Sequence, residues 1–90
     1  MRLDTFLSIS RLIKRRTQAK KACDFGAVLI DGIPAKASHN VRAGQKIQID
    51  FSNRLLEAEI LSVPPETNLT KEEAKNLYKV IREERKRVLE

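Results

Sequence analysis

The sequence predicts an α+β domain, in which short helices pack against a small, mostly antiparallel sheet. The first third of the chain places apolar residues at helical spacing, and the middle third alternates apolar and polar residues between turn signals. Hydrophobic residues make up 41% of the 90 residues, which is enough for one globular core in a chain of this length. We therefore expect one small core with little room for a deep enzyme cavity.

Two short helices are expected first. Apolar residues at spacing i, i+3, i+4 predict an amphipathic helix over about residues 3–9. Thr17 is the expected N-cap of a second helix, and Gly26 is its expected C-terminal stop. The apolar face of this second helix is formed by Ala19, Ala22 and Cys23. Both helices should therefore bury one face against the sheet.

The middle of the chain predicts a sheet of three to five strands. Val28–Ile30 is an apolar run followed by Asp31 and Gly32, a pair that favours a tight two-residue hairpin turn. Pro34 limits the returning strand to a short edge segment, because proline lacks a backbone N–H. Two further strands are expected at "KIQIDF" and "RLLEAEIL", which both alternate apolar and polar side chains around a turn at "SN".

The last third of the chain predicts a C-terminal helix. Pro64 and Pro65 end the sheet, and Thr70 followed three residues later by Glu73 fits a capping box. A helical stripe is then formed by Ala74, Leu77, Tyr78 and Ile81. We therefore expect a domain over residues 1–63 and a C-terminal helical extension over residues 64–90.

Charge is distributed unevenly along the chain. The net charge is +6, but residues 1–46 hold ten basic and three acidic residues, whereas residues 47–90 hold eight basic and nine acidic residues. The first half thus carries +7 and the second half −1, which favours a polyanionic partner for the first half. One cysteine, no recognisable signal peptide and no apolar run of membrane-spanning length lead us to expect a cytoplasmic protein.

Residues 10–22 concentrate the positive charge. The segment has no acidic residue and six basic ones, which are Arg11, Lys14, Arg15, Arg16, Lys20 and Lys21. Its apolar residues are expected to face the sheet, which forces the cations outward, where the start of the second helix adds a positive dipole end. RNA is favoured over duplex DNA, because no helix here has the length of a major-groove reader. A basic module that binds DNA or an acidic protein is the alternative.

The sequence shows no catalytic or metal-binding constellation. One histidine and one cysteine cannot form a zinc site, and the glycines are too scattered for a phosphate loop. His39 is interpreted as a loop residue and Cys23 as a small core residue. Asp4 is expected to cap the first helix or to pair with a nearby arginine. We therefore predict a protein without enzymatic activity, cofactor or bound metal.

Residues 2–51 contain three spaced motifs, "RLD-FL", "SR---R--A" and "G-V-I-G--AK-S--V--G--I-I". Together they resemble the S4 RNA-binding domain family. One departure is Gln45, where many relatives carry Asp after the glycine. The resemblance implies an S4-like fold with the αL motif, in which two helices pack on a small curved sheet and present a basic RNA-binding face.

The short chain and its "RLIKRRT-A" segment resemble stand-alone bacterial members of this family. The resemblance implies binding to ribosomal RNA of the large subunit and to the P-site tRNA, in quality control of stalled nascent chains. It also implies a nascent-chain tailing factor as a partner on the same subunit, and we expect a monomer. The alternative is a heat-shock-type member that recycles large subunits carrying peptidyl-tRNA. The residues implied to bind RNA are Arg2, Arg11, Lys14, Arg15, Arg16, Lys20, Lys21 and Lys36.

Arg16 carries the sharpest of these predictions. It directly precedes the expected N-cap Thr17, where free backbone N–H groups favour a phosphate. We therefore expect Arg16 to serve RNA binding and not folding. The structural alternative is an ion pair with Asp4 or Asp24.

Overall fold

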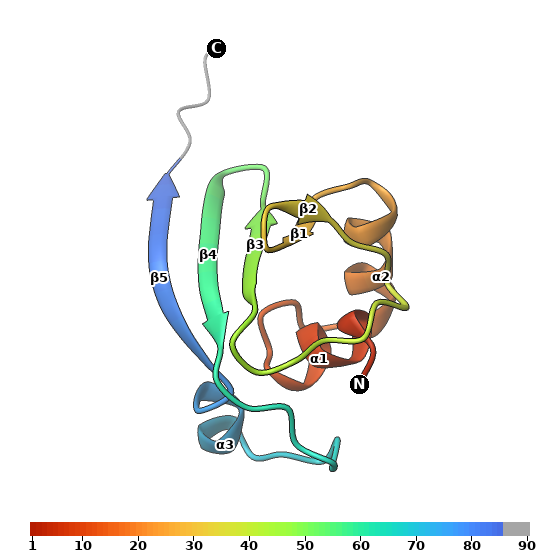
Figure 1. Cartoon of the computed structure of the whole chain (residues 1–90), viewed down its shortest axis with the longest axis vertical. Coiled ribbons are helices and arrows are strands. Elements are labelled where there is room, and N and C mark those ends of the chain that lie inside the picture. The colour runs from red at the N-terminus through yellow and green to blue at the C-terminus, as the bar shows by residue number, and fades with distance from the viewer. Residues whose placement is uncertain (86–90) are drawn as a thin grey trace.

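The protein is a five-stranded antiparallel sheet with two helices on one face (Figure 1). The computed structural model describes residues 1–85 of the chain. In chain order the elements are α1 (Leu3–Ile9), α2 (Arg16–Asp24), β1 (Val28–Ile30), β2 (Ile33–Pro34), β3 (Lys46–Asp50), β4 (Arg54–Ile60), α3 (Lys71–Lys75) and β5 (Tyr78–Arg85). The strand order is β2-β1-β3-β4-β5, and every neighbouring pair is antiparallel. The predicted α+β class is confirmed.

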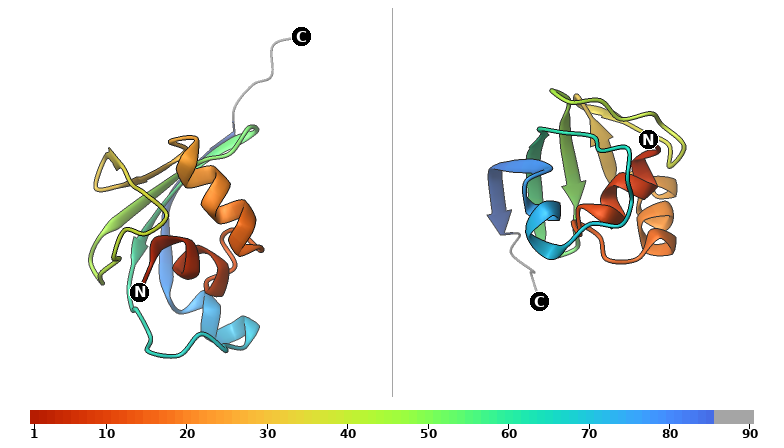
Figure 2. Two further views of the ribbon diagram at one scale, coloured as in Figure 1. Left: turned by 90° about the vertical axis from the view of Figure 1, so that its right-hand side faces the viewer. Right: turned by 90° about the horizontal axis from the view of Figure 1, so that it is seen from below.

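The core lies between the sheet and the two N-terminal helices (Figure 2). The predicted helix over residues 3–9 is found with those bounds, and it buries the apolar residues that predicted it. The side chains with at most 1% of their surface exposed include Leu3, Phe6, Leu7, Ala19, Val28, Ile47, Ile49, Ala58 and Ile60. Cys23 is also buried in this core, as expected. The helices α1 and α2 are thereby packed directly on the sheet.

The β1–β2 hairpin has the two-residue turn that the sequence predicts. Ile30 pairs with Ile33, so Asp31 and Gly32 form the loop, with φ angles of 50° and 84°. Positive φ at both positions is the requirement of a type I′ turn, and glycine adopts it without strain. Asp31 also fastens the turn to β3, because its N–H donates to the Lys46 carbonyl at 2.8 Å and its Oδ1 accepts from the Lys46 N–H at 2.9 Å.

The prediction that Thr17 caps α2 is wrong. The N-cap is Arg15, in an extended conformation with φ −110° and ψ 133°, and Arg16 is the first helical residue. The preceding residues Leu12 and Ile13 pack against the core, and the Ile13 N–H donates to the Leu7 carbonyl at 3.1 Å. This tertiary anchor sets where the helix begins, and the cap position carries no side-chain hydrogen bond.

The predicted C-terminal helix is wrong beyond Lys75. The capping box is present, with Thr70 Oγ1 accepting from the Glu73 N–H and Glu73 Oε1 accepting from the Thr70 N–H, each at 3.2 Å. The helix α3 has only five residues, however, and the chain then continues as β5 along β4. A helix this short has little intrinsic stability, whereas the seven-residue β4 offers a complete edge of backbone partners. Leu77, directly before β5, is buried in the core.

Residues 64–85 therefore form a short helix and a sheet strand, and not a helical extension. The boundary placed between residues 63 and 64 stays a prediction. Residues 86–90, the end of the predicted helix, lie outside the described residues. Within residues 1–85, no helix combines the length and the apolar character needed to cross a membrane.

Candidate nucleic-acid interface

The cations of residues 10–22 lie on the solvent side of the helical layer, as predicted. All six are exposed, whereas the apolar residues between them are turned to the core. Leu12, Ile13 and Ala22 are half-buried, and Ala19 and Cys23 are buried. We call these six cations, together with the predicted Arg2 and Lys36, the basic face.

Asp4 is the buried anchor of the basic face. Its side chain is 2% exposed, yet it accepts two hydrogen bonds from Arg2, at Oδ1 from Nε and at Oδ2 from Nη2, each at 3.2 Å. Arg16 Nε lies 3.5 Å from the same Oδ2. The predicted pairing of Asp4 with a nearby arginine is confirmed, and so is the ion pair named as the structural alternative for Arg16. The side chains of Arg2 and Arg16 remain about half exposed, and both are held at the same carboxylate.

The environment of Asp4 favours its charged form. Burial by itself raises the pKa of the carboxyl group, but the opposing interactions are stronger in sum. The hydrogen bonds from Arg2 and from the Thr5 N–H, together with the positive charges of Arg2 and Arg16, lower the pKa of Asp4 below its usual value. The carboxylate therefore stays ionised at neutral pH and keeps both arginines in place.

Lys36 reaches the basic face because its loop is tied to the start of the chain. The Leu3 N–H donates to the His39 carbonyl at 2.8 Å, and the Asp4 N–H donates to the Ala37 carbonyl at 3.1 Å. These bonds place the loop after β2 beside α1. They also fix His39 as a loop residue, as the sequence predicts.

A first hollow of about 430 Å³ lies between this loop and α2. Three predicted RNA-binding residues, Arg2, Lys20 and Lys36, line it together with the hydroxyl-bearing Ser38. Asp24 is the one acidic residue on its wall. Three cationic side chains from three separate segments around one hollow form a suitable site for a phosphate group.

A second hollow of about 250 Å³ lies beside the end of α1. Arg11 and Lys14 line it on one side, and Thr67, Asn68 and Leu69 line it on the other. The sequence analysis did not single out Ser38, Thr67 or Asn68. Polar residues in loops carry no periodic signal, so these residues are identified only by lining the same hollows as the predicted cations.

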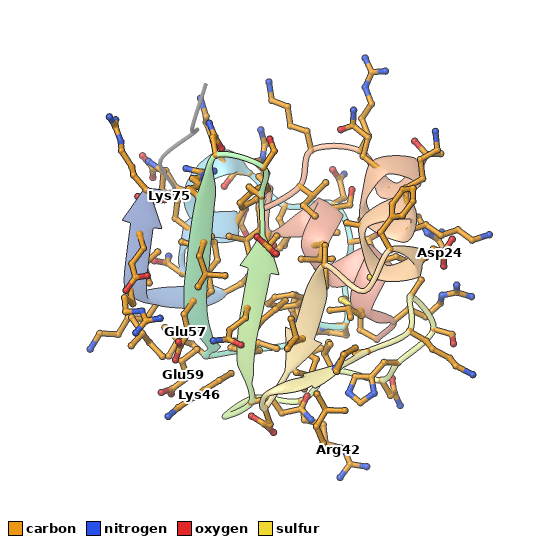
Figure 3. All side chains as sticks on the ribbon, turned by 90° about the horizontal axis from the view of Figure 1, so that it is seen from above. Asp24, Arg42, Lys46, Glu57, Glu59 and Lys75 are labelled. Atoms are coloured by element: carbon orange, nitrogen blue, oxygen red, sulfur yellow. The ribbon has the colours of Figure 1, made fainter. Side chains whose placement is uncertain are left out.

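The opposite face of the sheet carries mixed charge. Figure 3 shows Lys46, Glu57 and Glu59 projecting from the side away from the helices. Lys46 is directly opposite Glu59 in the β3–β4 register, and Gln48 Nε2 donates to Glu57 Oε2 at 3.2 Å. The positive surplus of the chain therefore lies on the helical side.

Cys23 has the chemistry of a core residue. Burial, and then the negative charges of Asp4 and Asp24, raise the pKa of its thiol to about 11. The thiol is therefore protonated at neutral pH and is a poor nucleophile. Within residues 1–85, no group of three or more His, Cys, Asp and Glu side chains is arranged to hold a metal ion.

Known proteins resemble this chain in both sequence and fold. The S4 domain family matches residues 1–47. A Bacillus subtilis (strain 168) protein named RQC P-site tRNA stabilizing factor is 44% identical over 85 residues, which cover 94% of this chain and 96% of that protein. A protein of the same name from Halalkalibacterium halodurans is 46% identical over 84 residues and 93% of each chain.

The fold agrees with this similarity. The trimeric heat shock protein 15 of Vibrio cholerae has a TM-score of 0.79 and 27% sequence identity to this protein, over 89% of this chain and 80% of that chain. The S4 match covers more than half of the chain and includes α1, α2, β1 and β2. The chain therefore belongs to the S4 domain family and, within it, to the family of the RQC P-site tRNA stabilizing factors.

Proposed function

We propose that this protein is a non-enzymatic RNA-binding factor of ribosome-associated quality control. Its basic face contacts ribosomal RNA of the large subunit and the P-site tRNA while a stalled nascent chain is processed. The protein acts as a monomer in the cytoplasm, beside a nascent-chain tailing factor on the same subunit.

The observation that carries the proposal is the convergence of cations from distant segments of the chain on one face. Arg2 and Arg16 meet at the buried Asp4, and Lys20 and Lys36 join Arg2 around the first hollow. Such a set matches the phosphates of a folded RNA, which is recognised by shape and backbone contacts. The names of the near full-length relatives point to the P-site tRNA as part of that RNA.

The second candidate is a heat-shock-type role, in which the protein recycles large subunits that carry peptidyl-tRNA. The likeness in fold to heat shock protein 15 favours it. Both candidates use the large subunit, so the state of the bound tRNA separates them. The alternative of a basic module that binds DNA or an acidic protein is distinguished from both candidates, because such a module would not bind ribosomal subunits.

The proposal is tested by co-sedimentation of the purified protein with large ribosomal subunits. We expect tighter binding to subunits with a P-site tRNA than to empty subunits, and no retention on small subunits. Arg16→Ala should weaken binding about ten- to a hundredfold, because a charge-assisted hydrogen bond contributes about 1.5–3 kcal/mol. Arg16→Lys should restore only part of it, since a point charge does not replace a bidentate fork.

Two controls accompany this experiment. Lys46→Ala removes a cation from the opposite face of the sheet and should bind like the wild type. A melting curve for each variant separates binding from folding, because Arg16 is also paired with Asp4. Wild-type protein that stays in the supernatant, or an Arg16→Ala variant that sediments like the wild type, would contradict the proposal. Equal binding to subunits with peptidyl-tRNA and with deacylated tRNA would leave the recycling role without support.

A further inference from the structure

We infer that the second hollow is a separate nucleotide site, in which the connector between β4 and α3 reads one unpaired nucleotide of the bound RNA. Arg11 and Lys14 hold its phosphate, and Thr67 and Asn68 meet its ribose and base edge. The inference rests on the proposed function, because it assigns a further contact to the same RNA. The connector lies outside residues 1–47, which the S4 domain family matches.

The connector passes α1, and residues of both segments line the hollows between them. It leaves β4 after Ile60, passes α1 and enters α3 (Figures 1 and 2). Val63 and Leu69 pack against the core, which fixes the connector at both ends of this passage. Between them, Thr67 lines the second hollow and also a neighbouring hollow that reaches Met1 and Arg2. The second site is therefore continuous with the rest of the basic face.

The backbone of Arg11 is an independent sign of function. Its φ is 63°, in the left-handed region, at the position directly after the C-cap of α1. Glycine is the usual residue there, because other side chains pay a conformational cost in that region. Position 11 nonetheless holds an arginine, and this arginine lines the second hollow together with Thr67 and Asn68. The costly backbone conformation of Arg11 at the edge of this hollow is an observed outlier, and from it we draw a hypothesis of function.

The chemistry of the hollow selects an unpaired nucleotide. Its volume of about 250 Å³ is below the roughly 300–1,000 Å³ of sites that enclose whole drug-sized ligands. Two cations on one wall suit a phosphate, and an asparagine amide on the other offers one donor and one acceptor to a base edge. In an A-form duplex the deep, narrow major groove keeps its base edges from side chains, and sequence-specific contacts are mostly made to unstacked bases, so the site favours a base that is splayed out of the helix.

The experiment compares two RNA hairpins that differ by one bulged nucleotide. The wild type should bind the bulged hairpin several-fold more tightly than the fully paired one. Asn68→Ala should lose about three- to tenfold in affinity for the bulged hairpin and almost nothing for the paired one, in line with one hydrogen bond. Asn53→Ala, an exposed asparagine in the β3–β4 turn, is the matched control and should keep the preference.

Arg11→Gly separates function from folding. Because glycine adopts positive φ freely, the variant should melt at the wild-type temperature or above it, while its affinity for the bulged hairpin falls about tenfold or more. In the Asn68→Ala background the same change should cost less than in the wild type, because both residues hold one nucleotide. Arg42→Gly, in the exposed loop before β3, is the control for charge.

Three results would overturn the inference. They are an Asn68→Ala variant with the wild-type preference for the bulge, an Arg11→Gly variant that melts well below the wild type, and fully additive effects of the two changes. If these occur while Arg16→Ala still loses large-subunit binding, the proposed function stands and only the second site fails. If the wild type binds neither hairpin nor subunit, both proposals fail.

Discussion

Asp4 shows how a single buried residue can organise an exposed surface. An isolated carboxylate at 1% exposure would be costly to bury, but here it is matched by two arginines and a backbone N–H. Both arginines keep about half of their surface in water, so the same contacts that satisfy Asp4 also aim Arg2 and Arg16 outward. The two arginines proposed to bind RNA are therefore also the partners that satisfy the buried Asp4.

This arrangement predicts an acid-sensitive part of the stability. The pKa of Asp4 is lowered in the folded protein, so its contribution is present above the unfolded carboxyl value of about 3.9 and is lost as pH falls through the lower folded value. Thermal melts between pH 7 and pH 2 should therefore show a loss of stability below about pH 4. Asp4→Asn should be less stable at pH 7 and should show a smaller difference between neutral and acidic pH. Equal pH dependence in both proteins would show that Asp4 does not contribute.

At the level of elements, the chain contains one turn that its local sequence specifies completely. The β1–β2 hairpin places β1 beside β3 and sends the following loop, with Lys36, back to the N-terminus. Asp31 and Gly32 both have positive φ, which few residue pairs other than Asp-Gly and Asn-Gly adopt readily. The turn is therefore formed by two adjacent residues, but it helps to place Lys36 on the basic face.

The substitution Gly32→Val tests the role of this turn in stability. A Cβ at position 32 would meet no atom within 4 Å, so any effect comes from the backbone conformation at φ 84° and not from a clash. We expect a loss of about 1–3 kcal/mol, which corresponds to a fall of roughly 4–8 °C in melting temperature per kcal/mol for a domain of this size. Gly32→Asn should lose less, because asparagine tolerates the left-handed region. A Val variant that melts like the wild type would refute the turn's role.

The C-terminal elements show the limit of local patterns. Ala74 and Leu77 are buried as a helical stripe requires, but Ile81 is 47% exposed and lies in a strand. Over so few residues, the same apolar pattern fits both the period of a helix and the period of a strand. The factor that decides between them is the edge of β4, which is open to a further strand. Residues far apart in sequence form that edge, and the local pattern at residues 74–81 contains no information about it.

For the whole molecule, the relevant property is the separation of charge between two faces. On the sheet, cations have acidic partners, as Arg54 has Glu83 at 3.0 Å and Arg82 has Glu84 at 3.3 Å. On the helical side, six exposed cations lie within residues 10–22, which contain no acidic residue. A polyanion therefore meets a net attractive field on one side of the protein only.

Salt dependence measures how much of this face is used. Neutralising about four to six phosphates should give a slope of roughly −3 to −5 in a plot of log affinity against log salt concentration. Charge reversal of Lys71, Lys75 and Arg82 should leave both the affinity for RNA and this slope nearly unchanged. If those reversals weaken binding as much as loss of Arg11 and Arg16 does, the interface extends over the C-terminal elements, and its assignment to the cations of the first half of the chain is wrong. Filter binding at four salt concentrations is sufficient.

The sequence by itself determined what adjacent residues encode. Apolar spacing, a turn pair and a run of cations are local properties, and they predicted α1, the β1–β2 hairpin and the exposed side of α2 correctly. The motifs at residues 2–51 also predicted the family. Position along the chain likewise showed that the positive surplus belongs to the first half.

Only the tertiary structure decided which residues meet. It placed Arg16 on Asp4, Lys36 beside Arg2, and Asn68 across a hollow from Arg11. It also turned Tyr78–Arg85 into a strand, and it placed the N-cap of α2 at Arg15, two residues earlier than the expected Thr17. The physical reason is the same in each case: these outcomes depend on backbone hydrogen bonds and packing between segments distant in sequence, whose free energy no local pattern contains.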